Sequence, residues 1–142
     1  GAERGVNYRG TDFVEAVREA ASDGGVDVIL DMVGRDYLQR NLDLLNLDGR
    51  LVIIALMSGA TAEVNLATMM RRRLIVTGST LRARTVEQKT AVVDAVGDRV
   101  WPLFETGRVR PVIHQRLGLE QAAEAHRLME ASTHIGKLLL VM

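Results

Sequence analysis

The feature that most constrains the fold is an alternation of short β-rich runs with amphipathic helical stretches along the 142 residues. The clearest β-rich runs lie at 26–31, 51–55 and 74–78, and helical periodicity fills the stretches between them. Strands that alternate with helices form a parallel sheet covered by helices. The sequence therefore predicts an α/β fold.

The remaining elements follow from the same reading. Two helix starts carry capping patterns, Asp12-x-x-Glu15 and Thr85-x-x-Gln88. Pro102 should kink or break the helix that begins after Thr85, because proline lacks the backbone N–H. The predicted helices cover 13–20, 37–47, 66–73, 86–101 and 119–131, and the further strands cover 5–8, 112–116 and 137–142.

Each of the strands at 26–31, 51–55 and 74–78 is followed by a loop. The loops cover residues 31–34, 57–60 and 79–82, and all three are built mainly from small or apolar residues. In open parallel sheets, ligands bind beyond the carboxyl ends of the strands. A flat ligand could therefore approach the backbone closely at these loops. The alternative is that their glycines only serve turns.

Composition excludes several classes of function. Eighteen basic and eighteen acidic residues cancel, so no broad field favours nucleic acid or an anionic membrane. The longest apolar run, 51–57, is far shorter than the roughly 20 residues that span a bilayer. There is no cysteine, which fits a cytoplasmic protein. The first residues lack both an initiator methionine and a signal-peptide pattern, so we expect a fragment.

The histidines and the run of arginines do not indicate a functional site. The three histidines are spaced twelve and eight residues apart, which matches no helix-face metal motif, so we predict no metal site. The run Arg71-Arg72-Arg73 falls where a helix should end, where cations offset the negative end of the helix dipole.

Several segments together resemble the medium-chain dehydrogenase/reductase superfamily. They are Gly5-Val6-Asn7-Tyr8, residues 26–34 (VDVILDMVG) and Asp48-Gly49-Arg50-Leu51-Val52. Residues 77–84 (TGSTLRAR), 125–130 (AHRLME) and 134–137 (HIGK) are similar to its zinc-independent, NADPH-dependent quinone oxidoreductase branch.

The resemblance implies a partial Rossmann domain, that is, a doubly wound parallel sheet. Family members have strand order 3-2-1-4-5-6 and a glycine-rich turn after strand 1 that holds the pyrophosphate. No G-x-G-x-x-G occurs here, so we expect the first two strands to be absent and strands 3 to 6 to remain. Residues 1–110 would form the partial NADP-binding domain, and residues 111–142 would rejoin the catalytic domain.

By the same resemblance, the complete enzyme passes hydride from NADPH to a quinone, and this segment contributes no catalytic residue. Asp31 would be structural. The residues that would face NADP(H) are Tyr8, Val33, Gly34, Met57, Ser58, Thr80, Leu81, Arg82 and His134.

Two alternatives remain open at this point. The chain could belong to another medium-chain reductase, either a zinc-type alcohol dehydrogenase or an enoyl reductase, or it could be a non-catalytic Rossmann-like module that binds a nucleotide or a partner. We expect the fragment itself to be inactive. We also expect a homodimer, formed through the strand at 74–78 or through the exposed edge at 26–30.

Overall fold

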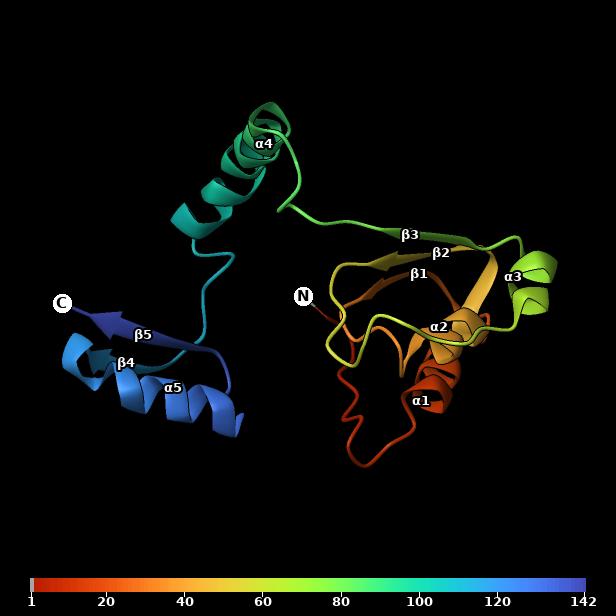
Figure 1. Cartoon of the computed structure of the whole chain (residues 1–142), viewed down its shortest axis with the longest axis horizontal. Helices are drawn as coiled ribbons and strands as arrows, with labels where there is room; N and C mark the ends of the chain where they lie inside the picture. Colours follow the sequence, from red (N-terminus) through yellow and green to blue (C-terminus); the bar gives the residue numbers. More distant parts are fainter. Residues whose placement is uncertain (1) are drawn as a thin grey trace. The chain divides into compact units, whose positions relative to one another are not determined.

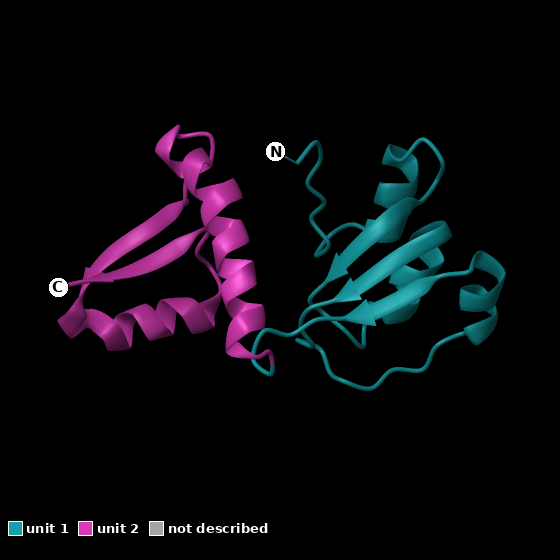
Figure 2. Cartoon of the chain, turned by 90° about the horizontal axis from the view of Figure 1, so that it is seen from above, with its two compact units in different colours: residues 1–83 teal, residues 84–142 magenta. Residues whose placement is uncertain are grey.

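The computed structural model describes residues 2–142, which divide into two compact units. Unit 1 covers residues 1–83 and unit 2 covers residues 84–142 (Figure 2). The sequence prediction of a division after residue 110 concerns the domains of a complete enzyme and stays a prediction.

Unit 1 is a parallel sheet flanked by helices (Figure 1). Its elements are α1 (Phe13–Ala20), β1 (Val26–Asp31), α2 (Leu38–Leu44), β2 (Leu45–Ile53), α3 (Leu66–Arg72) and β3 (Ile75–Gly78). The strands lie in the order β1-β2-β3 and pair in parallel, with Ile29 opposite Leu51 and Leu51 opposite Val76. The predicted α/β fold with a parallel sheet is confirmed.

The core of unit 1 lies on one face of the sheet. Leu42, Leu45 and Leu51 are almost fully buried, and α1 and α2 cover this face (Figures 1 and 2). Leu51 points into the core because alternate residues of a strand point to opposite faces. The buried face is therefore specified by the apolar residues of β2 and of α2.

No element of unit 1 covers the opposite face of its sheet, as far as the described residues 2–83 go. Val28 and Leu30 of β1 are each 63% exposed, and Ile75 of β3 is 46% exposed. The register places Val28, Arg50 and Ile75 side by side on this bare face. A parallel sheet normally has helices on both faces, so unit 1 carries the covering of one face only.

Two predicted elements of unit 1 differ in the structure. Residues 5–8 form no strand, which agrees with the expectation that the strands they would pair with are absent, and Tyr8 lies in a turn closed by the Gly10 N–H, which donates to the Asn7 carbonyl at 3.2 Å. A β-type segment becomes a strand only beside another strand, and the described sheet offers it none. The predicted helix 37–47 ends at Leu44, and β2 begins at Leu45.

Unit 2 begins with α4 (Val86–Glu105), which the predicted Thr85–Gln88 capping box opens. The prediction that Pro102 breaks the helix is wrong, since α4 continues to Glu105. Pro102 lies in the last turn of the helix, and its own carbonyl still accepts the Thr106 N–H at 3.1 Å. Within the described chain, α4 buries none of its residues.

The rest of unit 2 is a strand, helix and strand, as predicted. The elements are β4 (Ile113–Gly118), η1 (Leu119–Gln121), α5 (Ala122–Ala131) and β5 (Lys137–Val141). The two strands pair in parallel, and Leu117 and Ala125 are buried between sheet and helix. None of the helices in the described part of the chain combines the length and the hydrophobicity that a transmembrane helix needs.

Candidate functional site

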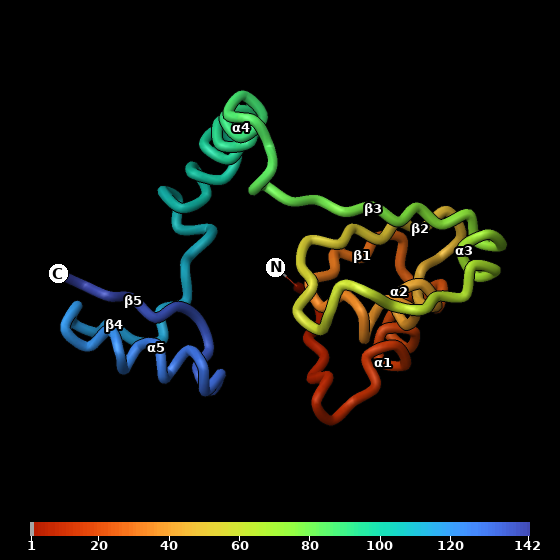
Figure 3. The backbone as a smooth tube through the Cα atoms, viewed as in Figure 1, coloured from red at the N-terminus to blue at the C-terminus, as the bar shows by residue number. Residues whose placement is uncertain are grey.

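The carboxyl ends of β1, β2 and β3 meet at one edge of the sheet of unit 1, because the three strands are parallel (Figure 3). The chain leaves β1 through Met32–Gly34, leaves β2 through Ile54–Ser58, and leaves β3 through Ser79–Arg82. The structure thus brings seven of the nine residues predicted from the sequence to one edge: Val33, Gly34, Met57, Ser58, Thr80, Leu81 and Arg82.

Ser58 braces the first two exits. Its Oγ donates to the Val33 carbonyl at 2.8 Å, and its backbone N–H donates to the same oxygen at 2.8 Å. The Ser58 Oγ also accepts the Asp36 N–H at 3.0 Å. A hydroxyl has one proton, and the Ser58 hydroxyl donates it to the Val33 carbonyl. The Ser58 side chain therefore joins the two loops and has no proton left to donate to a ligand.

Gly34 is required by the geometry of the β1 exit. Its φ of +85° is a conformation that residues with side chains rarely adopt, and a Cβ here would lie 2.9 Å from the Gly59 carbonyl oxygen. Gly34 and Gly59 also form an isolated parallel bridge. The exits of β1 and β2 therefore approach each other closely, backbone against backbone.

Asp31 holds the β1 exit from within. It is only 4% exposed, and its carboxylate accepts the Val33 N–H at 3.0 Å and the Gly34 N–H at 2.9 Å. These hydrogen bonds fix the loop that carries two of the predicted residues. The sequence identifies Asp31 only as structural, whereas the structure makes it the anchor of the candidate site.

A pocket of about 470 Å³ opens between the β2 and β3 exits. It is lined by Ile53, Ile54, Ala55, Leu56, Gly78, Ser79 and Thr80. Of the predicted residues only Thr80 lines it, while Leu81 and Met57 are 56% and 78% exposed at the same edge. The residues at 53–56 were missed because sequence reasoning took the strand to continue to Ala55. The topological rule for strand ends would have found them.

The other two predicted residues, Tyr8 and His134, do not belong to the strand exits of unit 1. Tyr8 is 64% exposed in its turn, and within residues 2–142 it makes no hydrogen bond or ring contact with the strand exits. His134 belongs to unit 2, just before β5, where its Nδ1 lies 3.2 Å from the Leu128 carbonyl oxygen.

The edge suits the flat part of a dinucleotide better than its phosphates. Small residues and exposed backbone at the exits allow close approach of a planar ring, and the pocket is apolar at Ile53, Ile54 and Leu56. The sequence has no glycine-rich turn to hold a pyrophosphate. The described residues also hold no group of three or more metal-binding side chains, so a zinc ion with three or four protein ligands does not fit them.

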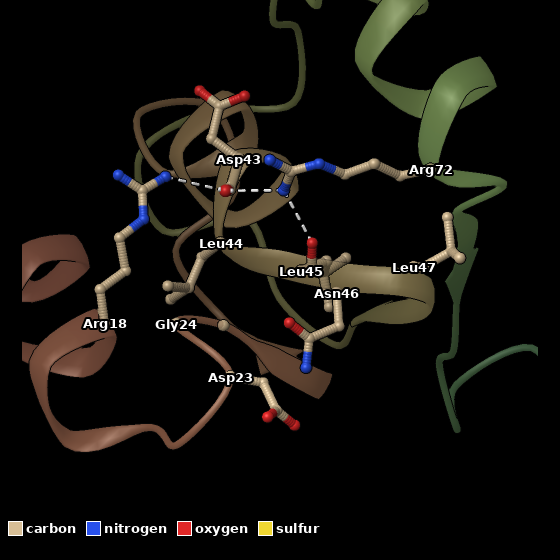
Figure 4. A pocket seen from close by; sticks show the side chains of 10 residues that line it. Arg18, Asp23, Gly24, Asp43, Leu44, Leu45, Asn46, Leu47 and Arg72 are labelled. Carbon is tan, nitrogen blue, oxygen red and sulfur yellow. Dashed lines mark hydrogen bonds between the residues drawn. The ribbon is translucent and has the colours of Figure 1, made fainter.

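A second pocket, of about 410 Å³, lies at the opposite ends of the strands (Figure 4). Arg18 and Arg72 converge there on the Asp43 carbonyl, at 3.0 and 2.8 Å, and Arg72 also donates to the Leu45 carbonyl at 2.7 Å. Carbonyls at the end of a helix lack partners inside it. The two arginines therefore close the end of α2, which accounts for one member of the basic run at 71–73.

Comparison with known proteins adds a family. A family model described as zinc-binding dehydrogenase matches residues 1–140. The quinone oxidoreductase of Rattus norvegicus is 30% identical over 145 residues, which cover 100% of this chain and 42% of the relative.

Two solved structures agree with this match. Escherichia coli quinone oxidoreductase complexed with NADPH is 29% identical, with a TM-score of 0.74 over 94% of this chain and 42% of that one. An NAD-dependent alcohol dehydrogenase is also 29% identical, with a TM-score of 0.75 over 100% of this chain and 38% of that one. The chain thus spans 42% of the length of the quinone oxidoreductases that it matches.

Proposed function

The chain belongs to the zinc-binding dehydrogenase family, and on that premise we propose that it is the cofactor-facing C-terminal part of an NADPH-dependent quinone oxidoreductase. The complete enzyme would transfer hydride from the nicotinamide of NADPH to a quinone. The cofactor supplies this chemistry, and the protein positions it and excludes water. Quinone oxidoreductases among the relatives, one of them solved with NADPH, support this choice.

The observation that carries the proposal is the braced edge of unit 1. Asp31 and Ser58 fix the β1 and β2 exits, and the pocket beside Thr80 opens next to them. Loops that hydrogen bonds already hold in place lose little conformational entropy when a ligand binds to them. This is a binding edge rather than a reactive one, and we assign no catalytic residue to it.

Each predicted residue has a proposed part in holding NADP(H). Gly34 lets the cofactor approach the backbone, and Val33, Met57 and Leu81 would pack against its rings. Ser58 holds the β1 and β2 exits together, and Thr80 and Arg82 would lie beside the nicotinamide carboxamide. Tyr8 and His134 would join them only in the longer protein, where residues 1–110 belong to the NADP-binding domain and residues 111–142 to the catalytic domain.

A second candidate is another reductase of the same superfamily, since the NAD-dependent alcohol dehydrogenase has an equally similar fold. A non-catalytic module that binds a nucleotide is the third candidate. Adding a benzoquinone or an alcohol to the longer protein distinguishes them. NADPH consumption with the quinone supports the first candidate, turnover of the alcohol supports the second, and cofactor binding without turnover of either supports the third.

The binding edge is tested by a matched pair of substitutions in the longer protein. Leu81 and Leu47 are 56% and 57% exposed, and they lie at opposite ends of the sheet. We expect Leu81→Asp to weaken NADPH binding about tenfold, because a carboxylate would have to be desolvated where the leucine makes an apolar contact with a cofactor ring. Leu47→Asp should change the affinity less than about twofold. Equal effects in a fluorescence titration would overturn the assignment of this edge.

We also propose that the longer protein is a homodimer. Within the described sheet, β1 and β3 are both edge strands, and an edge strand is a template for pairing with another chain. The strand at 74–78 would form the contact in the longer protein, whereas the edge at 26–30 would be open to a second copy only in the 142-residue chain, where the neighbouring strand is missing. Lysine substitution of Val76, which is 37% exposed, should dissociate a dimer formed through β3, as measured by light scattering.

A further inference from the structure

Two of the three histidines, which are far apart in the sequence, lie against each other in unit 2. His114 is in β4 and His134 precedes β5, and their ring centroids are 5.9 Å apart with an interplanar angle of 61°. The parallel pairing of β4 with β5 brings them together, with Ile113 opposite Lys137. No helix-based spacing rule detects this pair, because strand pairing creates it.

The environment of His134 determines which ring nitrogen carries the proton. Its Nδ1 lies 3.2 Å from the Leu128 carbonyl oxygen. A carbonyl oxygen can only accept, so Nδ1 is the donor, and in the neutral ring Nε2 presents its lone pair. Histidines that bind metals are commonly held in this way, with one nitrogen donating to a backbone carbonyl and the other directed at the metal.

The separation of the rings suits a shared ion. A metal–nitrogen bond of about 2.1 Å places the metal about 3.2 Å from a ring centroid, so two rings on one ion have centroids at most about 6.4 Å apart. A tetrahedral angle between the two bonds corresponds to about 5.2 Å. The observed 5.9 Å lies between these values. The site requires the exposed His114 ring to turn one of its nitrogens toward Nε2 of His134.

We propose that His114 and His134 form a two-histidine site for a divalent transition metal such as Zn²⁺, Ni²⁺ or Cu²⁺, with water as the remaining ligands. Imidazole is a preferred ligand of these ions. Two protein ligands make a weaker site than the three or four of catalytic and structural zinc. The inference does not rest on the proposed function, because the intact 142-residue chain can be tested without NADPH.

The test is calorimetric titration of the chain with NiCl₂ and ZnCl₂, using His126 as the matched control. His126 lies on α5 and is exposed, and within the described residues no ring contact joins it to another histidine. We expect His114→Gln and His134→Gln each to weaken binding at least tenfold, and His126→Gln to change it less than twofold. Unchanged affinity in His114→Gln, or an equal loss in all three variants, would overturn the proposal.

A second readout guards against misfolding of the His134 variant. Electron paramagnetic resonance of the Cu²⁺-loaded chain should show coupling to two imidazole nitrogens in the native sequence and to one in His114→Gln. His114 is exposed, so its replacement should leave the circular dichroism spectrum unchanged. Coupling to a single imidazole in the native chain would also refute the two-histidine site.

Discussion

At the scale of single residues, Arg40 of α2 links the first two helices through two contacts, with Phe13 and with Asp12, and it also contacts Tyr37 at the start of its own helix. Its guanidinium lies 4.2 Å from the centroid of the Phe13 ring and 5.6 Å from that of Tyr37, and it forms a 2.8 Å ion pair with Asp12. The two rings stack on each other at 4.7 Å. A planar guanidinium can stack on aromatic rings and pair with a carboxylate at once.

Arg40 should therefore stabilise unit 1 through its shape as well as its charge. We expect Arg40→Ala to lower the free energy of unfolding by about 1 kcal/mol, the usual size of an exposed cation–π contact. Arg40→Lys keeps the charge and should recover only part of that loss. Urea denaturation measures both variants, and full recovery by lysine would show that stacking contributes nothing.

Asp12 gives the same region a dependence on pH. The Val14 N–H chiefly, together with the Arg40 side chain and the Glu15 N–H, keeps the pKa of the Asp12 carboxyl below its ordinary value, although desolvation opposes this. The folded state thus binds this proton more weakly than the unfolded state. The contribution of Asp12 is complete above an unfolded pKa of about 3.9 and is lost as the pH falls through the lower folded pKa.

This sign predicts the behaviour of Asp12→Asn. The amide oxygen can still cap α1 but does not titrate, so the variant should lose less stability than the native chain between pH 6 and pH 3. Urea denaturation at the two pH values measures the difference. Equal losses in the two proteins would assign the acid sensitivity to other carboxylates, such as Glu87, whose pKa is also lowered, first by its own backbone N–H.

Asp31 is the residue on which the candidate site depends most. Its buried carboxylate accepts two backbone N–H groups, and in Asp31→Asn one of them would face an amide NH₂. An unsatisfied buried donor costs about 1–3 kcal/mol, so we expect a loss of stability in that range. Asp36→Asn is the control, because its side chain is 56% exposed and should change stability little. Equal losses in the two variants would contradict the anchoring role.

At the scale of elements, the features that could be predicted from the sequence are those that depend on interactions between residues close together in the chain. The caps at Asp12 and Thr85 both form, because each depends on residues within one helical turn. The strand predicted at 5–8 does not form, because a strand needs a second strand to pair with, and a local sequence pattern cannot show whether that second strand is present. The edge that carries the candidate site followed from topology alone. The hydrogen bonds of Asp31 and Ser58 that fix the loops at this edge could not be predicted, because they depend on the positions of side chains in the folded protein.

Helix α4 buries none of its residues within unit 2, so we expect local interactions to determine its stability in that unit. Gly97 lies in its interior, where a Cβ would meet nothing within 4 Å. We expect Gly97→Ala to stabilise the helix by about 1 kcal/mol. Amide hydrogen exchange across α4 should slow accordingly.

Gly24 is the matched control for this prediction. A Cβ there would also meet nothing within 4 Å, but the residue has a φ of +68°. Gly24→Ala should therefore destabilise unit 1, because a side chain disfavours this conformation while the available space is the same. Stabilisation by both substitutions would show that the backbone conformation is not the deciding factor.

At the scale of the whole molecule, unit 1 by itself leaves bare a face that is normally covered in a parallel sheet. Val28 and Leu30 are neighbouring exposed apolar residues on the bare face of unit 1 and belong to its edge strand β1, while Ile75 lies on the same face beyond Arg50. Exposed apolar patches next to an open edge promote association between chains. We therefore expect the 142-residue chain alone to associate in a concentration-dependent way in light-scattering measurements.

The same surface can be altered without touching the core. The double substitution Val28→Lys and Leu30→Lys places charges on the bare face, where each native side chain is already 63% exposed, so the urea midpoint should change little. The variant should remain monomeric at concentrations where the native chain associates, because lysines on and beside an edge strand oppose pairing. Leu51→Lys is the contrasting variant: Leu51 is fully buried on the other face, so the lysine should unfold unit 1. If the double variant associated as strongly as the native chain, the contact between chains would have to come from β3 or from unit 2. The bare face of unit 1 would then play no part in association.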